Sequence, residues 1–214
     1  MASRPVFMPN DRKPYSIEWP VEFSYNAGFA PSQKQKNIVA LHKGFAEEFP
    51  GKKVLEISSK SLQPEGVLLS AFSLKKFVPS LGRSLPVENI YHAGKVFEYG
   101  GPYLDLLEKS ARESKKDERT HMSGGIIGFR FEDMDFPIMP RTAFYDFLYM
   151  NALLENEELM KAVLQYDAFT DIEFNPKKSL ACQANAAAKF VSLYKAGKID
   201  QIRSADTFLA LFTR

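Results

Sequence analysis

The segment at residues 87–97 carries three side chains that can do acid–base or nucleophilic chemistry. Glu88, His92 and Lys95 are spaced i, i+4 and i+7, so on a helix they project from one face. A carboxylate, an imidazole and an amine on one face can exchange protons with a substrate. Such spacing is also typical of a charged stripe on a solvent-facing helix, and spacing alone favours that interpretation. Gly94 costs roughly 1 kcal/mol against alanine inside a helix, which indicates that something packs closely there.

Two carboxylates in the segment at 170–179 form a second candidate. Asp171 and Glu173 are two residues apart, which in an extended segment puts both on one face. Paired carboxylates divide into acid and base roles when their surroundings separate their pKa values. The competing interpretation is a solvated turn beside Asn175-Pro176, and the motif alone favours the turn.

A third candidate follows the strand predicted at residues 54–57. Ser58, Ser59 and Lys60 can present hydroxyls, amides and an ammonium to a phosphate. The segment lacks the GxxxxGK[ST] pattern, so it is not a P-loop. A polar hairpin loop explains it equally well.

Metal and thiol chemistry have little support. The three histidines are isolated, with no HExxH motif and no cysteine cluster, so we expect no metal site and no cofactor. Cys182 lies in an alanine-rich segment, where a buried and inert thiol is the better interpretation. In the charged run at 110–119, Arg112 or Lys116 can reach a phosphate, and the sequence does not choose between them.

The chain alternates strand and helix patterns. The proline-rich arm at 1–20 predicts strand and loop, and Ser32 with Gln35 resembles a capping box. Gly197 is a helix-ending signal. The remaining pattern predicts strands at 21–25, 54–57 and 125–131, helices at 30–49, 87–97, 102–119, 141–154, 156–166, 180–197 and 204–212, and a turn-rich segment at 167–179.

These elements predict a helix-rich α+β single domain with a small sheet. No composition-shifted linker divides the chain. We expect residues 1–55 to form a strand–helix–strand elaboration that packs on a main domain at 56–214.

Composition narrows the class of protein further. The 214 residues hold 28 Lys and Arg against 26 Asp and Glu, a formal charge of +2, which argues against a protein that wraps nucleic acid by charge. One cysteine excludes an intrachain disulfide and fits a reducing compartment. No apolar run reaches the roughly 20 residues of a membrane span, and residues 1–10 lack the apolar core of a signal peptide. We therefore expect a cytoplasmic protein without a membrane partner.

The motifs taken in order resemble a known family. AFS at 71–73, VENIYHAGKVF at 87–97, SARESKK at 110–116, TAFYDFLYMNALLENEELMKAVL at 142–164, TDIEF at 170–174 and CQANAAAKF at 182–190 are similar to the successive motifs of the NADAR family, also called YbiA-like N-glycosidases. The resemblance covers about residues 56–196. No single motif is highly specific, but their order is.

Further segments resemble one branch of that family. The N-terminal arm, YNAGFAPSQKQKNI, EISSKS and FTDIEFNPKKS are similar to NADAR proteins encoded beside DarT-type toxins, which attach ADP-ribose to guanine bases of DNA. The resemblance implies an N-glycosidase, or ADP-ribosyl hydrolase, with ADP-ribosylated guanine in DNA as substrate and ADP-ribose as product. The chain would then be the antitoxin to a DarT-type toxin.

The resemblance also implies roles for individual residues. Lys95 would lie at the reacting sugar, as a Schiff-base nucleophile or as a ligand of the diphosphate, and Glu88 would orient or deprotonate it. Asp171 and Glu173 would activate water or bind ribose hydroxyls. The family's usual Glu-His pair is Glu88-Asn89 here, so the histidine's role is lost or passes to His92. The implied ligand-binding residues are Ser59, Lys60, Ser73, His92, Arg112, Gln183 and Asn185.

Two other functions stay open. The chain can be an N-glycosidase on a small ribosylated metabolite of riboflavin biosynthesis, although FNPKKS replaces the W-G-x-G segment common in the wider family. It can also be a non-catalytic protein that binds ADP-ribose or the toxin. The second alternative needs the phosphate-contacting residues but neither Glu88 nor Lys95.

Overall fold

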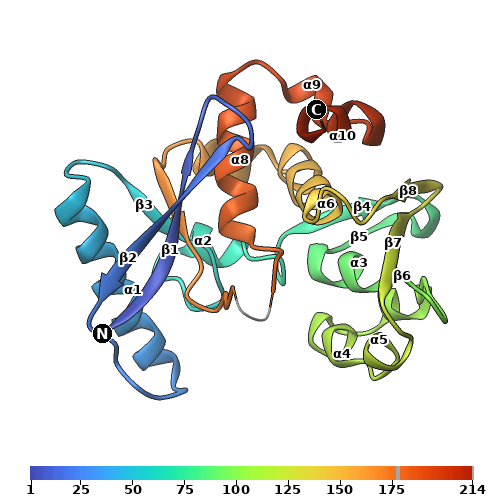
Figure 1. The fold of residues 1–214 in the computed structure, drawn as a ribbon, viewed down its shortest axis with the longest axis horizontal. Helices are drawn as coiled ribbons and strands as arrows, with labels where there is room; N and C mark the ends of the chain where they lie inside the picture. The colour runs from blue at the N-terminus through green and yellow to red at the C-terminus, as the bar shows by residue number, and fades with distance from the viewer. Residues whose placement is uncertain (177–178, 214) are drawn as a thin grey trace. The chain divides into compact units, whose positions relative to one another are not determined.

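The computed structural model describes residues 1–176 and 179–213 and confirms the helix-rich α+β class (Figure 1). The chain divides into two compact units. The first unit comprises Met1–Ser70 and Glu157–Ile199, and the second comprises Ala71–Asn156 and Asp200–Arg214. The domain boundary predicted after residue 55 stays a prediction. No helix in the described part of the chain is long and apolar enough to cross a membrane.

The first unit is built on a four-stranded sheet in the order β2-β1-β9-β3. β1 (Ala2–Pro9) and β2 (Ser16–Phe23) form an antiparallel hairpin, whereas β3 (Val54–Glu56) pairs in parallel with β9 (Ala168–Thr170). The prediction of a turn-rich segment at 167–179 was wrong for β9, and its residues 177 and 178 lie outside the described part of the chain. The three residues of β9 are all buried, because pairing with distant strands on both sides outweighs the turn signals that follow.

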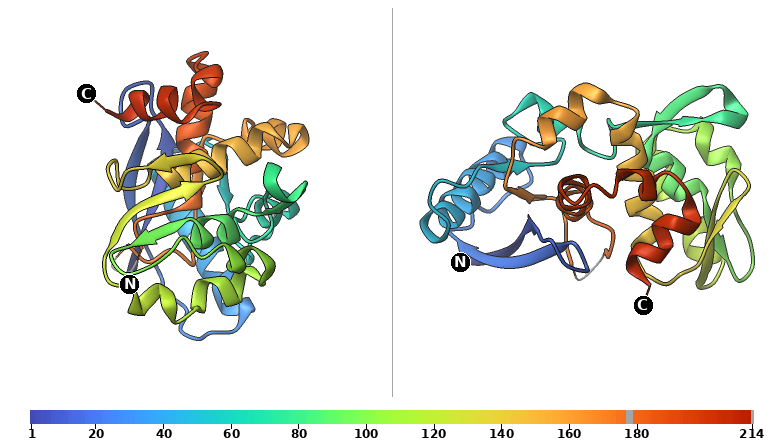
Figure 2. Two further views of the ribbon diagram at one scale, coloured as in Figure 1. Left: turned by 90° about the vertical axis from the view of Figure 1, so that its right-hand side faces the viewer. Right: turned by 90° about the horizontal axis from the view of Figure 1, so that it is seen from above.

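Helices cover both faces of this sheet. α1 (Pro31–Glu48) buries Ile38, Leu41 and Phe45 against alternate residues of the β1–β2 hairpin. The intervening β1 residues are buried as well, and α8 (Gln183–Lys195) packs on the same strands from the other side (Figure 2, right, with α8 seen end-on). Two shorter helices, α2 (Pro64–Leu68) and α7 (Glu157–Val163), contact each other in this unit.

Two signals were predicted at the ends of α1 and α8, and only the one that ends α8 is confirmed. The capping box predicted for Ser32 and Gln35 was wrong: Ala30 is the N-cap and Pro31 opens the helix, so Ser32 already lies inside it. Proline suits the first turn because its missing N–H would have no helical partner. The closure of α8 by Gly197 is confirmed. Gly197 has φ +66°, and the next residue's N–H reaches back to Leu193 O over 2.9 Å, as in a Schellman motif.

The second unit combines two small sheets with buried helices. β4 (Lys75–Val78) and β5 (Arg83–Pro86) form one hairpin, joined through the short 3-10 helix η1 (Pro79–Leu81). β6 (Lys95–Phe97), β7 (Ile126–Phe131) and β8 (Met134–Phe136) form an antiparallel sheet. α6 (Ala143–Leu154) is almost wholly buried and contacts β4, α3 (Val87–Ala93) and α10 (Ala205–Phe212). The short α9 (Ile199–Ile202) precedes α10.

The helix predicted at 87–97 is shorter than expected, with seven residues. It ends at Ala93, and Lys95 already belongs to β6. The carbonyls at its end bind distant amides instead of another helical turn: Ala93 O accepts from the N–H of Tyr103 (3.0 Å) and Gly94 O from that of Arg130 (2.7 Å). Pairing with β7 therefore stops the helix where its own pattern would continue.

The single helix predicted at 102–119 is three short pieces. They are the 3-10 helix η2 (Leu104–Glu108), α4 (Ala111–Lys116) and α5 (Arg119–Met122). Ser110 caps α4, and the Glu113 side chain bonds back to the Ser110 N–H, so both halves of a capping box are present. Because the capping box at Ser110 begins a new helix, the segment cannot form the one continuous helix that its composition predicts.

Replacing Gly94 with alanine is expected to destabilise the protein by about 1–3 kcal/mol, the usual cost of overpacking a core. A Cβ at this position would lie 2.5 Å from Arg130 O and 2.8 Å from Phe144 Cζ. The measurement is urea unfolding. Gly125→Ala is the matched control, because its Cβ would meet nothing closer than 3.4 Å; equal stability of the two variants would contradict the close approach at Gly94.

Candidate active site

Four charged side chains of the second unit converge around α3. Glu88 and His92 come from α3, Lys95 begins β6, and Lys115 comes from α4. Glu88 Oε1 lies 3.3 Å from His92 Nε2 and 3.1 Å from Lys115 Nζ, and Lys95 Nζ lies 3.1 Å from His92 Nδ1. Glu88, His92 and Lys95 therefore lie together, as predicted. They do so because the chain turns from α3 into β6, and not because all three project from one face of a helix.

This cluster is not a solvent-facing stripe. Glu88 is 6% exposed and His92 7% exposed, so the interpretation that spacing favoured was wrong. A buried carboxylate is costly unless opposite charges and hydrogen bonds compensate. His92 and Lys115 supply that compensation from two different elements.

Asn89 positions one side of the site. It occupies the place of the family's histidine, and its buried Nδ2 donates to Lys109 O (2.6 Å), Leu106 O (3.4 Å) and Ser114 Oγ (3.2 Å). These bonds tie α3 to η2 and to α4, the helix that carries Lys115. The Asn89 side chain thus has a structural explanation at this position.

Aromatic rings line the other side. Lys95 Nζ lies 4.7 Å from the centre of the Tyr91 ring, within range of a cation–π contact. Tyr91 itself stacks on Phe129 (5.8 Å) and meets Tyr145 edge-on (5.2 Å). The rings fix the lysine and exclude water from one side of its amine.

The surroundings shift all three pKa values. Burial lowers the pKa of Lys95 to about 8, against the opposing effect of the Glu88 charge, and Lys115 lowers it further. Burial also lowers the pKa of His92, although its hydrogen bond to Glu88 works against this. Burial by itself would raise the pKa of Glu88, but the hydrogen bonds and charges of His92 and Lys115 hold it below its usual value.

These shifts define a proton path. With His92 neutral, its Nε2–H donates to the Glu88 carboxylate, and its Nδ1 accepts from the Lys95 amine, the tautomer that satisfies both contacts. His92 can then take a proton from Lys95 while Glu88 stabilises the imidazolium, the arrangement by which an acid–histidine pair activates a nucleophile. The cluster can therefore present an uncharged amine to an electrophilic carbon.

A known protein family matches almost the whole chain. The DarT1-associated NADAR antitoxin family matches residues 2–214. The chain belongs to this family. The search of curated proteins found no match. The match spans both units, and it confirms the resemblance drawn from the ordered motifs.

In this NADAR antitoxin, the first unit holds a second buried acidic cluster. Glu56, fully buried in β3, accepts from Thr170 Oγ1 (2.6 Å) and from the Ile172 N–H (2.8 Å). Asp171 Oδ1 accepts from the backbone N–H groups of Glu173 (3.0 Å) and Phe174 (3.1 Å). Burial and then the charge of Glu56 raise the pKa of Asp171, and burial raises that of Glu56. Burial and a neighbouring carboxylate charge both favour the protonated form of a carboxyl.

The predicted pairing of Asp171 with Glu173 on one face was wrong. Residues 171–174 form a turn and not an extended segment, so Glu173 lies exposed and pairs with Lys34 (3.2 Å). The carboxyl whose charge raises the pKa of Asp171 is that of Glu56, which the motifs did not single out. Its signal was an acidic residue inside the apolar strand VLEI.

The other predicted ligand-binding residues of the first unit surround the carboxyl ends of β3 and β9. Gln183, at the start of α8, donates to Ile57 O (2.7 Å) and also hydrogen-bonds the Asp171 carboxyl. Ser59 is exposed in the following loop and accepts from Lys60 Nζ (2.9 Å). Asn185 instead accepts from Ser16 Oγ of β2 (2.6 Å). Their binding roles stay predictions.

Two predicted ligand-binding residues belong to the second unit. Ser73 is half-buried in the segment that precedes β4, and Arg112 is exposed on α4. It is Lys115, and neither Arg112 nor Lys116, that reaches Glu88. Cys182 is buried and burial raises its pKa, in agreement with an inert thiol. Within residues 1–176 and 179–213, no group of three or more His, Cys, Asp or Glu is arranged to hold a metal ion.

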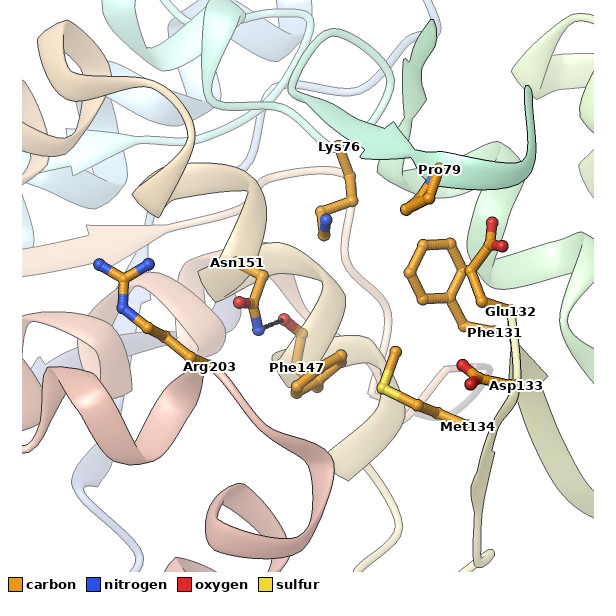
Figure 3. A pocket seen from close by; sticks show the side chains of 9 residues that line it. All are labelled: Lys76, Pro79, Phe131, Glu132, Asp133, Met134, Phe147, Asn151 and Arg203. Atoms are coloured by element: carbon orange, nitrogen blue, oxygen red, sulfur yellow. Dashed lines mark hydrogen bonds between the residues drawn. The ribbon is translucent and has the colours of Figure 1, made fainter. Parts of the chain in front are cut away.

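A separate pocket of about 240 Å³ lies in the second unit (Figure 3). The cluster around Glu88 does not line it. Lys76 on its wall is already paired with Glu155 (2.5 Å), and Asn151 donates to Phe147 O (3.0 Å). These two polar groups of its wall are thus bound within the protein. The lining residues are Lys76, Pro79, Phe131, Glu132, Asp133, Met134, Phe147, Asn151 and Arg203.

We expect the Lys95 amine to titrate with a midpoint of about 8, against an ordinary value of 10.5. Glu88→Gln should lower this midpoint, because the Glu88 charge favours the protonated amine, and Lys115→Gln should raise it for the opposite reason. The measurement is NMR titration of ¹³Cε-labelled lysine, with Lys95→Arg identifying the resonance by its loss. A midpoint near 10.5 in the wild-type protein would contradict the burial of this amine.

The buried acid pair predicts how stability depends on pH. A carboxyl whose pKa is raised on folding stabilises the protein below its unfolded pKa of about 4, and that stability is lost as pH rises through the folded pKa. Glu56→Gln should therefore flatten the fall in unfolding free energy above pH 4. Urea unfolding at several pH values measures the fall in both proteins.

The difference between the two pH curves reports on Glu56 and the groups in contact with it. One of these is His42, whose Nε2 lies 2.8 Å from the Thr170 hydroxyl that bonds Glu56; burial lowers the pKa of His42 to about 4, which gives an opposite slope between about 4 and 6.5. Glu47→Gln, at an exposed position on α1, is the control. A wild-type slope kept by Glu56→Gln would refute the raised pKa of Glu56.

Proposed function

We propose that this antitoxin is an ADP-ribosyl hydrolase of the cytoplasm that removes ADP-ribose from guanine bases of DNA and so reverses the action of a DarT-type toxin. The proposal rests on one observation above all, the contiguous contact of Lys95, His92 and Glu88. Membership of the DarT1-associated antitoxin family supports the pairing with a toxin of that type. A protein that only masks its toxin has no need of such a buried proton path.

The reaction breaks the N-glycosidic bond between guanine and the distal ribose. As this bond lengthens, positive charge develops at the ribose C1, and a fixed carboxylate can stabilise it. In the proposed route the Lys95 amine forms a bond to C1 while the bond from C1 to the base breaks and the base leaves with the proton that His92 carries; water then adds to C1, which releases ADP-ribose and regenerates the amine. The His92–Glu88 pair takes the proton that the ammonium must first lose.

The pKa of Lys95 makes this route workable near neutral pH. With a pKa of about 8, about a quarter of the amine is uncharged at pH 7.5, against about a thousandth for an ordinary lysine. In the other role left open, Lys95 stays protonated and binds the diphosphate. Burial that lowers its pKa favours the nucleophile, because a phosphate ligand gains nothing from losing its charge.

The decisive assay is release of ADP-ribose from an oligonucleotide carrying one ADP-ribosylated guanine, followed by chromatography and mass spectrometry. Glu88→Gln and Lys95→Arg should each slow release by about 10²–10⁴-fold, the usual contribution of an acid–base group. Lys75→Gln, at an exposed position on β4, should act as wild type. Melting temperatures close to that of the wild type would assign the losses to chemistry.

The same assay separates the alternatives. Binding of ADP-ribose without release would make the chain a reader, and release only from a small ribosylated metabolite would make it a metabolic N-glycosidase. For the role of Lys95, borohydride should trap a covalent adduct on that residue during turnover. Turnover by Lys95→Ala without any trapped adduct would exclude the nucleophile and leave the diphosphate ligand.

A further inference from the structure

The outer face of α1 forms the floor of an open groove in the first unit. The groove holds about 580 Å³. Its floor residues follow helical spacing along α1, and the neighbouring loops supply its two ends. The lining residues are Asn26, Ser32, Gln35, Lys36, Val39, Ala40, Lys43 and Leu62. Neither Val39 nor Leu62 belongs to the core, since both are more than half exposed.

The charge of the groove is positive. Lys36 and Lys43 are both exposed, and neither has an ion-pair partner among residues 1–176 and 179–213. They stand seven residues apart, about 10 Å along a helix. That distance matches a few successive phosphates of a nucleic acid strand, which follow at 3.4 Å or more. Among residues 1–176 and 179–213, no acidic side chain lines the groove.

Two aromatic residues, Tyr25 and Phe29, belong to the loop that contributes Asn26 to the groove. Phe29 is 99% exposed and Tyr25 is 50% exposed, although burial of such rings would stabilise the fold. Their loop is held by a buried amide clamp: Asn37 Oδ1 accepts from the Asn26 N–H (2.7 Å), and Asn37 Nδ2 donates to Asn26 O (2.9 Å). The rings are therefore presented to solvent by a defined backbone.

We propose that this groove binds a single DNA strand that flanks the modified guanine. The inference rests on the proposed function, which makes DNA part of the substrate. Lysines that follow the backbone, together with aromatic rings on which bases stack, are the two features by which proteins hold single strands. A duplex offers its phosphates but hides the base faces, so it cannot use Tyr25 and Phe29. An acidic protein surface would be complementary to Lys36 and Lys43 but not to the aromatic rings.

The loop at 58–63 connects the groove to the predicted phosphate-binding residues. Leu62 lines the groove, and Ser59 and Lys60 lie three and two residues before it. Lys60 Nζ stays beside Ser59 Oγ. A strand in the groove thus passes the same loop that is predicted to bind the diphosphate of the adduct.

The first test uses binding alone. Fluorescence anisotropy with an unmodified single-stranded oligonucleotide should show weaker binding for Lys36→Gln/Lys43→Gln, and the slope of log Kd against log salt should fall by about 0.7 for each lysine. Phe29→Ala should weaken binding about fivefold or more, with little salt dependence. Because Phe29 is almost fully exposed, that variant leaves the core intact. Lys52→Gln/Lys195→Gln, exposed in the same unit, is the matched control.

The second test uses turnover. On an ADP-ribosylated oligonucleotide the groove variants should raise KM with kcat unchanged, whereas on ADP-ribosylated guanosine they should equal the wild type. The groove assignment would be overturned if the groove variants kept the wild-type KM on the oligonucleotide as well as on the guanosine. It would also be overturned if they lost toxin binding while DNA binding stayed intact. If the wild type hydrolyses neither substrate, the proposed function fails, and the anisotropy result still decides the groove.

Discussion

The hydrogen bond between Glu88 and His92 is the constraint on which the rest of the candidate site depends. A carboxylate that is 6% exposed cannot stay ionised without partners. His92 provides one from the same helix, and Lys115 provides another from α4, a helix held in place by Asn89. Lys95 then meets the far nitrogen of the same imidazole. One buried charge thus accounts for the placement of three other side chains.

The first unit meets a similar electrostatic demand by a different route. Glu56 and Asp171 are both buried, and burial is the largest cause of the raised pKa of each. Backbone amides and Thr170 hydrogen-bond these carboxyls. The two residues lie at the carboxyl ends of the parallel strands β3 and β9, where polar side chains of α/β sheets usually meet ligands. The two units therefore hold buried acids of opposite character: the pKa of Glu88 is lowered, whereas those of Glu56 and Asp171 are raised.

Near-neutral net charge is compatible with a nucleic acid substrate. A formal charge of +2 cannot support an extended phosphate grip, and the structure has no need of one. Lys36 and Lys43 lie together on one groove, while many other lysines and arginines are paired with carboxylates, as in the contacts of Lys109 and Arg119 with Asp117. Local placement, and not total charge, decides where an anionic strand can bind.

The sequence by itself determined the element types that depend on local pattern: α1, α6, α8, β3 and β7, the glycine that closes α8, the buried thiol, and the order of motifs that identifies the NADAR antitoxin family. It also picked out Glu88, His92 and Lys95. Only the tertiary structure decided that α3 stops at Ala93, that residues 168–170 form a strand, that Lys115 reaches Glu88, and that Asp171 pairs with Glu56. Periodicity reports which face of an element is apolar, but strand pairing and buried charge are settled between residues far apart in the chain, whose contacts leave no local pattern.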